Sequence, residues 1–156
     1  MSVQKVFLFD FDGVIVDGMR EYWNSSLLAC EKYLNSPHIT VDQKLYKSVP
    51  VIFKEIRPWV KYGWEMVLIV YQIIKKENQL EQFNKDDFIN KYHQNCQRIL
   101  RENSWTAEDL QKVLDMSRNY QIEKDFEKWV NLHNPFFEVL NFMEELRKRG
   151  IKTGII

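Results

Sequence analysis

Two carboxylates, Asp10 and Asp12, follow directly on an apolar run, Val6–Phe9. An apolar run of that length, bounded soon afterwards by Gly13, predicts a buried, parallel β-strand. Carboxylates at the end of such a strand are costly to bury without a cation or a chemical role. Because ligands bind at the carboxyl ends of the strands in open α/β sheets, we expect any chemistry of this chain to lie here.

The residue types suit nucleophilic attack assisted by a hard cation. A carboxylate becomes a competent nucleophile toward a phosphoryl group once a cation offsets the repulsion between the negative charges. Mg²⁺ prefers oxygen ligands and takes one or two carboxylates together with substrate phosphate. Side chains two residues apart in a strand point the same way, so Asp12 faces the site beside Asp10 if the backbone stays extended. Gly13 allows a sharp turn or a positive φ immediately afterwards.

The stretch KVFLFDFDGVIVD, residues 5–17, resembles motif I of the haloacid dehalogenase superfamily. The resemblance implies that Asp10 is the nucleophile, which forms an aspartyl intermediate, and that Asp12 is the general acid/base. It also implies Mg²⁺ bound by the Asp10 side chain and the Asp12 backbone carbonyl, with Gly13 as a candidate substrate-binding residue. A strand end followed by an acidic turn is the alternative interpretation. Asp17 fits either an acidic position of the family or a cap of the next helix.

The composition is that of one globular domain, or of a domain with an insertion. The chain has 156 residues, of which 45% are hydrophobic, enough for a core. Its formal net charge is zero, which argues against nucleic-acid or anionic-membrane partners. The most apolar internal run, residues 66–74, is too short to span a bilayer. We expect no signal peptide, reduced thiols at Cys30 and Cys96, and a cytoplasmic location.

Helical patterns fill the chain between a strand at about residues 5–10 and a second strand at 151–156. The predicted helices cover residues 19–34, 41–56, 62–76, 84–101, 107–119 with a continuation through 129, and 136–149. Pro50 forces a kink or two shorter helices. Asn84, and Thr106 with Asp109, are expected N-terminal caps, and Gly150 is expected to end the last helix.

This order of elements predicts an α/β fold with a large helical insertion. A right-handed crossover would set the two strands parallel, and residues 19–133 are far more than a crossover needs. That stretch resembles the helical cap that some haloacid dehalogenase enzymes insert between motifs I and II. Residues 135–156 are similar to the family's approach to motif II. We therefore predict an incomplete Rossmann-like core of that family, with two parallel strands, from residues 1–18 and 134–156, and a helical cap from residues 19–133.

The family's remaining motifs have no counterpart in the sequence. The Ser or Thr of motif II is expected one position after Ile156, and Thr153 lies inside the strand instead of at its end. The Lys of motif III and the acidic pair of motif IV are also missing. Two parallel strands would leave an apolar edge that recruits other chains. We expect a piece of a longer protein, with a truncated relative that self-associates through its strand edges as the alternative.

Arg57 is the cap residue that we expect nearest a substrate. It begins a segment, residues 57–65, that places charged residues and two Trp around a Pro and a Gly. An Arg suits an anionic substrate through bidentate hydrogen bonds, and a structural Arg–Glu pair at a helix corner is the alternative. His38, His93 and His133 lie far apart in the sequence, and surface or capping roles suit them better than a metal site.

The sequence favours a Mg²⁺-dependent phosphatase that acts on a small phosphorylated metabolite through an aspartyl-phosphate intermediate. In this scheme Asp10 attacks in line, and Asp12 protonates the leaving oxygen and then activates water. A phosphomutase or phosphonatase on the same fold is one alternative. A non-catalytic interaction module, in which the helical part is the functional part, is the other.

Overall fold

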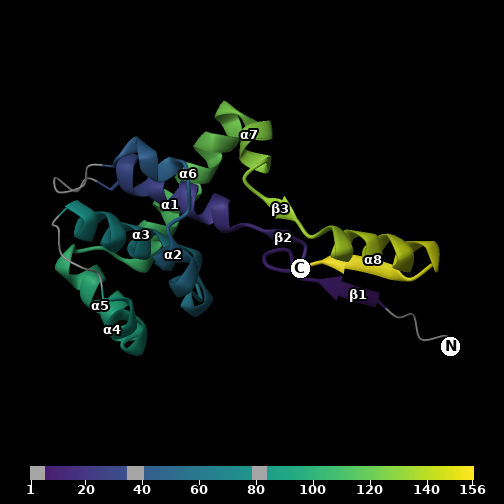
Figure 1. The fold of residues 1–156 in the computed structure, drawn as a ribbon, viewed down its shortest axis with the longest axis horizontal. Helices are drawn as coiled ribbons and strands as arrows, with labels where there is room; N and C mark the ends of the chain where they lie inside the picture. Colours follow the sequence, from purple (N-terminus) through teal and green to yellow (C-terminus); the bar gives the residue numbers. More distant parts are fainter. Residues whose placement is uncertain (1–5, 35–40, 79–83) are drawn as a thin grey trace.

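The computed structural model describes residues 6–34, 41–78 and 84–156. The helices are α1 (Met19–Lys32), α2 (Val51–Ile56), α3 (Gly63–Asn78), α4 (Lys85–Asn90), α5 (Tyr92–Glu102), α6 (Ala107–Lys124), α7 (Phe126–Val130) and α8 (Phe137–Lys148), with 3₁₀ turns at Gln43–Tyr46 and Arg57–Trp59. The strands are β1 (Val6–Phe9), β2 (Val16–Asp17), β3 (Asn134–Pro135) and β4 (Lys152–Ile155). Figure 1 shows α1–α7 gathered at one end of an elongated molecule and β1, β4 and α8 at the other. The predicted α/β class is confirmed.

The small sheet pairs β1 with β4 in parallel, as predicted, with Leu8 opposite Gly154. Phe7 and Phe9 both pack edge-on against Phe142 of α8, with ring centroids 6.4 and 6.2 Å apart. Leu8 points to the opposite face because side chains alternate along a strand, and it is exposed. The prediction that this strand is buried is therefore wrong except at Phe9, because α8 covers only one face of the described sheet.

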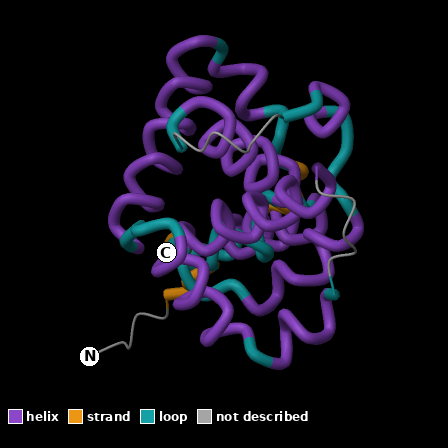
Figure 2. The backbone as a smooth tube through the Cα atoms, turned by 90° about the vertical axis from the view of Figure 1, so that its left-hand side faces the viewer, coloured by secondary structure: helices purple, strands orange, loops and turns teal. Residues whose placement is uncertain are grey.

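The main hydrophobic core lies in the helical part, where α3 packs against both α1 and α6. Residues 66–74 of α3 are apolar on almost every side, and a helix of that kind is stable only when neighbours surround it. Trp23 of α1 and Phe53 of α2 are fully buried and meet edge-on at 5.2 Å. The backbone in Figure 2 shows how completely helices build this part of the molecule.

Helix ends follow the local sequence signals closely. The Asn84 Oδ1 accepts a hydrogen bond from Asp87 N at 3.0 Å. Thr106 and Asp109 form the expected capping box, in which each side chain accepts a hydrogen bond from the other residue's backbone N–H at 3.0 Å. Pro50 divides its stretch into a 3₁₀ turn and α2, the second of the two outcomes expected for it. These predictions are confirmed.

A short antiparallel pair, β2 with β3, joins the two parts of the molecule and was not predicted. Val16 pairs with Pro135, and Phe136 N donates a hydrogen bond to Ile15 O at 2.9 Å. Figure 1 shows both connections running side by side between the helices and the small sheet. We expected only a turn at residues 134–135. The division into residues 1–18 with 134–156 and a cap of 19–133 stays a prediction, and β2 and β3 lie at its boundaries.

Candidate active site

The candidate site begins where β1 ends. Asp10 follows Phe9 immediately and is exposed at the carboxyl end of the strand. The chain then turns, because Ile15 N and Val16 N both donate hydrogen bonds to Phe11 O, at 3.0 and 3.1 Å. Residues 10–16 are called the carboxylate turn below. The regular strand therefore does not extend as far as Asp12, which was the condition for Asp10 and Asp12 to point the same way.

Two glycines shape the backbone around the carboxylate turn. Gly13 has a φ of +79°, in the left-handed region that the expected sharp turn requires. At Gly18, a Cβ atom would lie 2.6 Å from Cζ of Tyr22, so no side chain fits between the backbone and that ring. Asp17 accepts a hydrogen bond from Met19 N at 2.9 Å and so caps the start of α1. The capping interpretation of Asp17 is confirmed.

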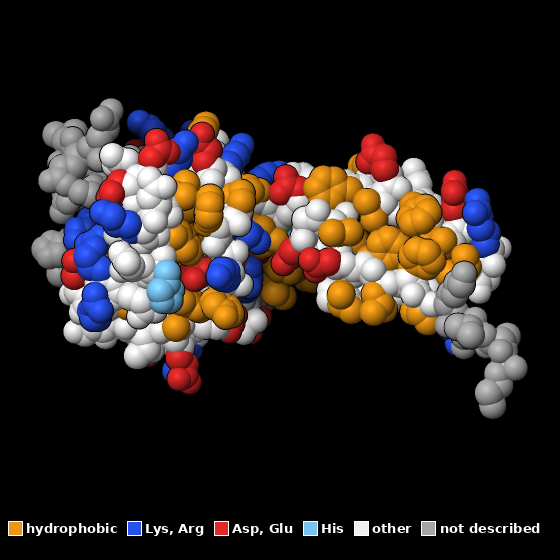
Figure 3. Space-filling model, turned by 90° about the horizontal axis from the view of Figure 1, so that it is seen from below, with side chains coloured by type: hydrophobic (Ala, Val, Ile, Leu, Met, Phe, Trp, Pro, Cys, Tyr) orange, Lys and Arg blue, Asp and Glu red, His pale blue; other side chains and the backbone are white. Residues whose placement is uncertain are grey.

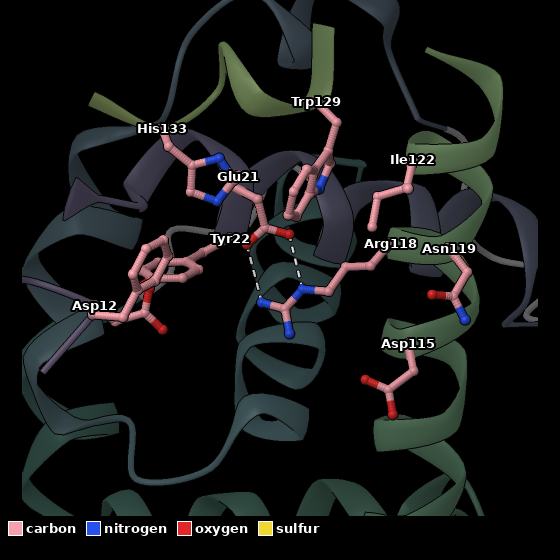
Figure 4. A pocket seen from close by; sticks show the side chains of 10 residues that line it. Asp12, Glu21, Tyr22, Asp115, Arg118, Asn119, Ile122, Trp129 and His133 are labelled. Atoms are coloured by element: carbon pink, nitrogen blue, oxygen red, sulfur yellow. Dashed lines mark hydrogen bonds and ion pairs between the residues drawn. The ribbon is translucent and has the colours of Figure 1, made fainter. Parts of the chain in front are cut away.

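A pocket of about 520 Å³ lies between the carboxylate turn and helices α1, α6 and α7 (Figure 4). Its sides are formed by Phe11, Asp12, Glu21, Tyr22, Asp115, Arg118, Asn119, Ile122, Trp129 and His133. Of the four residues predicted for the site, only Asp12 is in this set. Asp10 lies two residues before it along the chain, and Gly13 follows it. The pocket is thus next to the predicted acid/base and is built mostly by the helical part.

A buried ion pair joins α1 to α6 at one side of the pocket. The Glu21 carboxylate is only 2% exposed and accepts hydrogen bonds from Arg118 Nε at 2.8 Å and from Arg118 Nη2 at 3.0 Å. Ser25 Oγ donates a third hydrogen bond to it at 2.6 Å, and Gln121 Nε2 donates to Ser25 Oγ in turn. This network meets the hydrogen-bonding needs of a buried carboxylate, which would otherwise be very costly to remove from water.

The electrostatics of Arg118 connect it to the rest of the pocket. Burial acts to lower the pKa of the Arg118 guanidinium, but its hydrogen bonds to Glu21 and the Glu21 charge outweigh burial. Asp115 and Asp12 add smaller contributions, and the net result is a pKa raised above the ordinary value. Both carboxylates therefore contribute to the field at Arg118, and Figure 4 shows Asp12 and Asp115 around the same pocket.

Tyr22 links the pocket to Arg57. Burial raises the pKa of the Tyr22 phenol, and the nearby Asp12 carboxylate raises it further, whereas Arg57 acts in the opposite direction. The Arg57 guanidinium lies 4.6 Å from the centre of the Tyr22 ring. Within the described residues, neither Tyr22 Oη nor Arg57 Nε has a hydrogen-bond partner. Arg57 thus lies behind Tyr22, outside the set of residues that line the pocket.

The alternative interpretation of Arg57, a structural pair with a nearby Glu, has no counterpart among the ion pairs of the described residues. Glu65 is the acidic residue of that segment, and its carboxylate accepts hydrogen bonds from Lys61 N at 2.7 Å, Tyr62 N at 3.2 Å and the Tyr92 hydroxyl at 3.2 Å. Glu65 therefore closes the turn before α3 without the guanidinium of Arg57.

Sequence reasoning missed most of the pocket. On α6, Asp115, Arg118, Asn119 and Ile122 recur at helical spacing, which places them on one face. That spacing was a usable signal, but nothing local indicated that this face would meet Glu21, which lies 97 residues before Arg118.

The predictions for the three histidines have different outcomes. His133 was expected at the surface or as a cap, and it is half-buried against Trp129, with ring centroids 4.8 Å apart, at the edge of the pocket. His93 is exposed on α5. The remaining prediction concerns His38, which lies outside the described residues.

The residues present fit part of a Mg²⁺ site. Among the described residues, no group of three or more His, Cys, Asp or Glu side chains could hold a metal ion. Asp10 and Asp12 nevertheless offer only oxygen donors, and both are exposed beside the pocket. Because Mg²⁺ is commonly held by one or two carboxylates together with water and substrate phosphate, these two residues suit it.

Three comparisons with known proteins complete the description. The sequence model of the family described as hydrolase, haloacid dehalogenase-like hydrolase, matches residues 4–156. The matched range includes β1, the carboxylate turn, the whole helical part and β4. Neither the curated proteins nor the solved structures that were searched contain a match. Over residues 6–34, 41–78 and 84–156, no helix combines the length and apolar character needed to cross a membrane.

Proposed function

Because the chain belongs to the haloacid dehalogenase-like hydrolases, we propose that it is a phosphatase that uses Asp10 as nucleophile on a small phosphorylated metabolite. The position of Asp10 is the main support. Its carboxylate is exposed at the carboxyl end of β1, where a ligand can reach it, and the pocket next to Asp12 offers room for the rest of the substrate. A nucleophile and an acid/base that are neighbours on one turn match the needs of phosphoryl transfer.

The proposed reaction has two steps. In the first, an Asp10 carboxylate oxygen bonds to phosphorus, the bond from phosphorus to the leaving oxygen breaks, and Asp12 gives that oxygen a proton. In the second, Asp12 takes a proton from water, the water oxygen bonds to phosphorus, and the bond between phosphorus and the Asp10 oxygen breaks, which frees the Asp10 carboxylate and inorganic phosphate. Bound Mg²⁺, held by the Asp10 side chain and the Asp12 carbonyl, would offset the negative charge of the phosphoryl group.

The test is phosphate release by the purified protein and by an Asp10→Asn variant. We expect the variant to keep its far-UV circular dichroism and to lose turnover by at least about a thousandfold, because an amide is not a competent nucleophile here. Asp86→Asn, at an exposed position on α4, is the matched control and should keep full activity. Chelation with EDTA should stop turnover, and added Mg²⁺ should restore it. Full activity of Asp10→Asn would overturn the proposal.

Product analysis distinguishes the phosphatase from its closest alternatives. A phosphatase yields inorganic phosphate and an alcohol, a phosphomutase yields an isomer of the substrate, and a phosphonatase breaks a bond between carbon and phosphorus. The same substrate, followed by ³¹P NMR, separates these outcomes.

A second candidate function, an interaction module, is favoured by the apolar surface at the sheet end. Val6 and Leu8 are exposed on the uncovered face of the sheet, and Phe137 of α8 is also exposed. Figure 3 shows how apolar side chains gather over this part of the molecule. We propose that a second copy of the chain covers this surface, because exposed apolar patches of this kind mark contacts between protein molecules. Light scattering should then detect dimers that Leu8→Lys converts to monomers, and a monomeric wild type would exclude this candidate.

A further inference from the structure

The pocket beside Asp12 has a charge pattern that bears on the substrate. We infer that it takes an uncharged, hydroxyl-bearing leaving group of the sugar type, and that Asp115 on α6 selects against leaving groups with a negative charge. This inference rests on the proposed function, because it assigns the pocket to the part of the substrate that departs with a proton from Asp12.

The described residues that line the pocket include no Lys or Arg with an unmatched positive charge. Arg118 is the only Lys or Arg among the described residues that line it, and Glu21 holds two of its donor nitrogens. The Asp115 carboxylate then has no cation of its own among the described residues that line the pocket, whereas Asp12 carries a proton when the leaving group departs in the proposed reaction. A carboxylate or a second phosphate on the leaving group would face the Asp115 carboxylate, and like charges at close range repel.

The hydrogen-bonding groups distinguish an uncharged leaving group from a cationic one. The buried Trp129 Nε1 has no partner among the described residues, so it is a donor in need of an acceptor. Asp115 supplies acceptor oxygens, of which one is shared with Gln111. A hydroxyl both donates and accepts and so suits donors and acceptors together, whereas an ammonium group can only donate.

Tyr22 adds a second reason to expect a polar ligand at this corner. Its side chain is 5% exposed, and within the described residues its hydroxyl has no hydrogen-bond partner. A ligand oxygen in this part of the pocket would give the hydroxyl a partner within hydrogen-bond distance, beside the Asp12 carboxylate that raises its pKa.

The apolar surfaces of the pocket fit a ring. Phe11, Tyr22 and Trp129 contribute aromatic side chains to the lining of the pocket. Its volume of about 520 Å³ is within the range of pockets for small molecules. Aromatic faces beside a few well-placed polar groups are the usual composition of such pockets, and a sugar ring offers C–H faces to the former and hydroxyls to the latter.

A set of three six-carbon phosphates tests the charge selection. Glucose 6-phosphate, glucosamine 6-phosphate and 6-phosphogluconate carry an uncharged, a cationic and an anionic leaving group. Because 6-phosphogluconate is open-chain, sorbitol 6-phosphate, which is open-chain and uncharged, is the control for shape. We expect kcat/KM to be highest for glucose 6-phosphate and at least about tenfold lower for 6-phosphogluconate. Asp115→Lys should raise the ratio of 6-phosphogluconate to glucose 6-phosphate turnover by at least about tenfold. Glu123→Lys, exposed on the same helix and outside the pocket, is the control and should leave the ratio unchanged.

Binding to Asp10→Asn separates this inference from the proposed function. The indole N–H resonance of Trp129, assigned with Trp129→Phe, should shift saturably on titration with glucose 6-phosphate and respond less to 6-phosphogluconate at equal concentration. If the wild type releases no phosphate from any compound while this binding order holds, the proposed function fails and the inference stands. Preferred binding of 6-phosphogluconate, no binding of any of the three, or an unchanged ratio in Asp115→Lys would overturn the inference.

Discussion

Breaking the ion pair between Glu21 and Arg118 should lower the free energy of unfolding far more than breaking an exposed ion pair of similar length. Its closest contact is 2.8 Å, and a second pair, Arg98 with Glu102, has a closest contact of 2.7 Å. The pairs differ in burial, because the side chains of Glu21 and Arg118 are 2% and 28% exposed and those of the second pair are both 49% exposed. Comparing Arg118→Met with Arg98→Met therefore isolates the effect of burial at a constant distance.

The expected magnitudes follow from what each variant leaves behind. Arg118→Met leaves the Glu21 carboxylate buried with only the Ser25 hydroxyl as a donor, and an uncompensated buried charge costs about 3–5 kcal/mol. Arg98→Met removes an exposed helical pair that is worth about 0.3–0.5 kcal/mol. Replacing both Glu21 and Arg118 by Met should recover most of the loss, because no charge then remains buried.

Urea unfolding followed by far-UV circular dichroism measures these differences as changes in the free energy of unfolding. Equal losses for the two single variants would refute the reasoning, since burial would then have no effect. A double variant no more stable than Arg118→Met would also refute it, because the cost would then come from lost packing and not from the unpaired carboxylate.

Three further predictions concern the helices and the carboxylate turn. Burial raises the pKa of the Cys30 thiol far above its usual range and that of Cys96 to about 12, so neither should react with Ellman's reagent at pH 8 until the protein is unfolded in urea. Thr106→Ala should cost about 1 kcal/mol of unfolding free energy through loss of the cap. Because hydrogen bonds from Thr106 lower the pKa of Asp109, the stability they provide is present above the unfolded pKa of an Asp and is lost as the pH falls through the folded value, so the difference should shrink in acid. Gly13→Ala should cost about 1 kcal/mol through its positive φ alone, since a Cβ there meets no atom within 4 Å, and Gly13→Asn should cost less in the same assay.

Features set by neighbours in the sequence were predictable. The capping box of Thr106 and Asp109 and the cap at Asn84 depend on residues three positions apart, so the pattern contains all the information needed. The parallel pairing of the two strands followed from the helix between them. The burial of β1 could not be read in the same way. An apolar strand sequence indicates that the strand tends to be buried. Whether Leu8 is buried depends on which other elements pack against its face of the sheet.

The pocket was the least predictable feature, because contacts between distant helices create it. Glu21 and Arg118 are ordinary charged residues in their own helices, and only the packing of α1 on α6 makes them partners. His133 was expected at the surface or as a cap, and it instead meets Trp129 at the edge of the pocket. Local patterns identified Asp12, and the tertiary arrangement determined what surrounds it.

Helix α6 contributes residues to both the core and the pocket. The residues suited to a test of substrate recognition are therefore those on α6 that line the pocket without packing in the core. Leu110 and Leu114 are fully buried in the core, whereas Asp115 is exposed at the pocket and bonds only within its own helix. Arg118 lies between these environments, so its loss would weaken the contact of α6 with α1 and alter the pocket at once. A change in activity at Arg118 therefore cannot separate stability from recognition. Asp115 can, because reversing its charge changes the field in the pocket without removing either member of the buried ion pair.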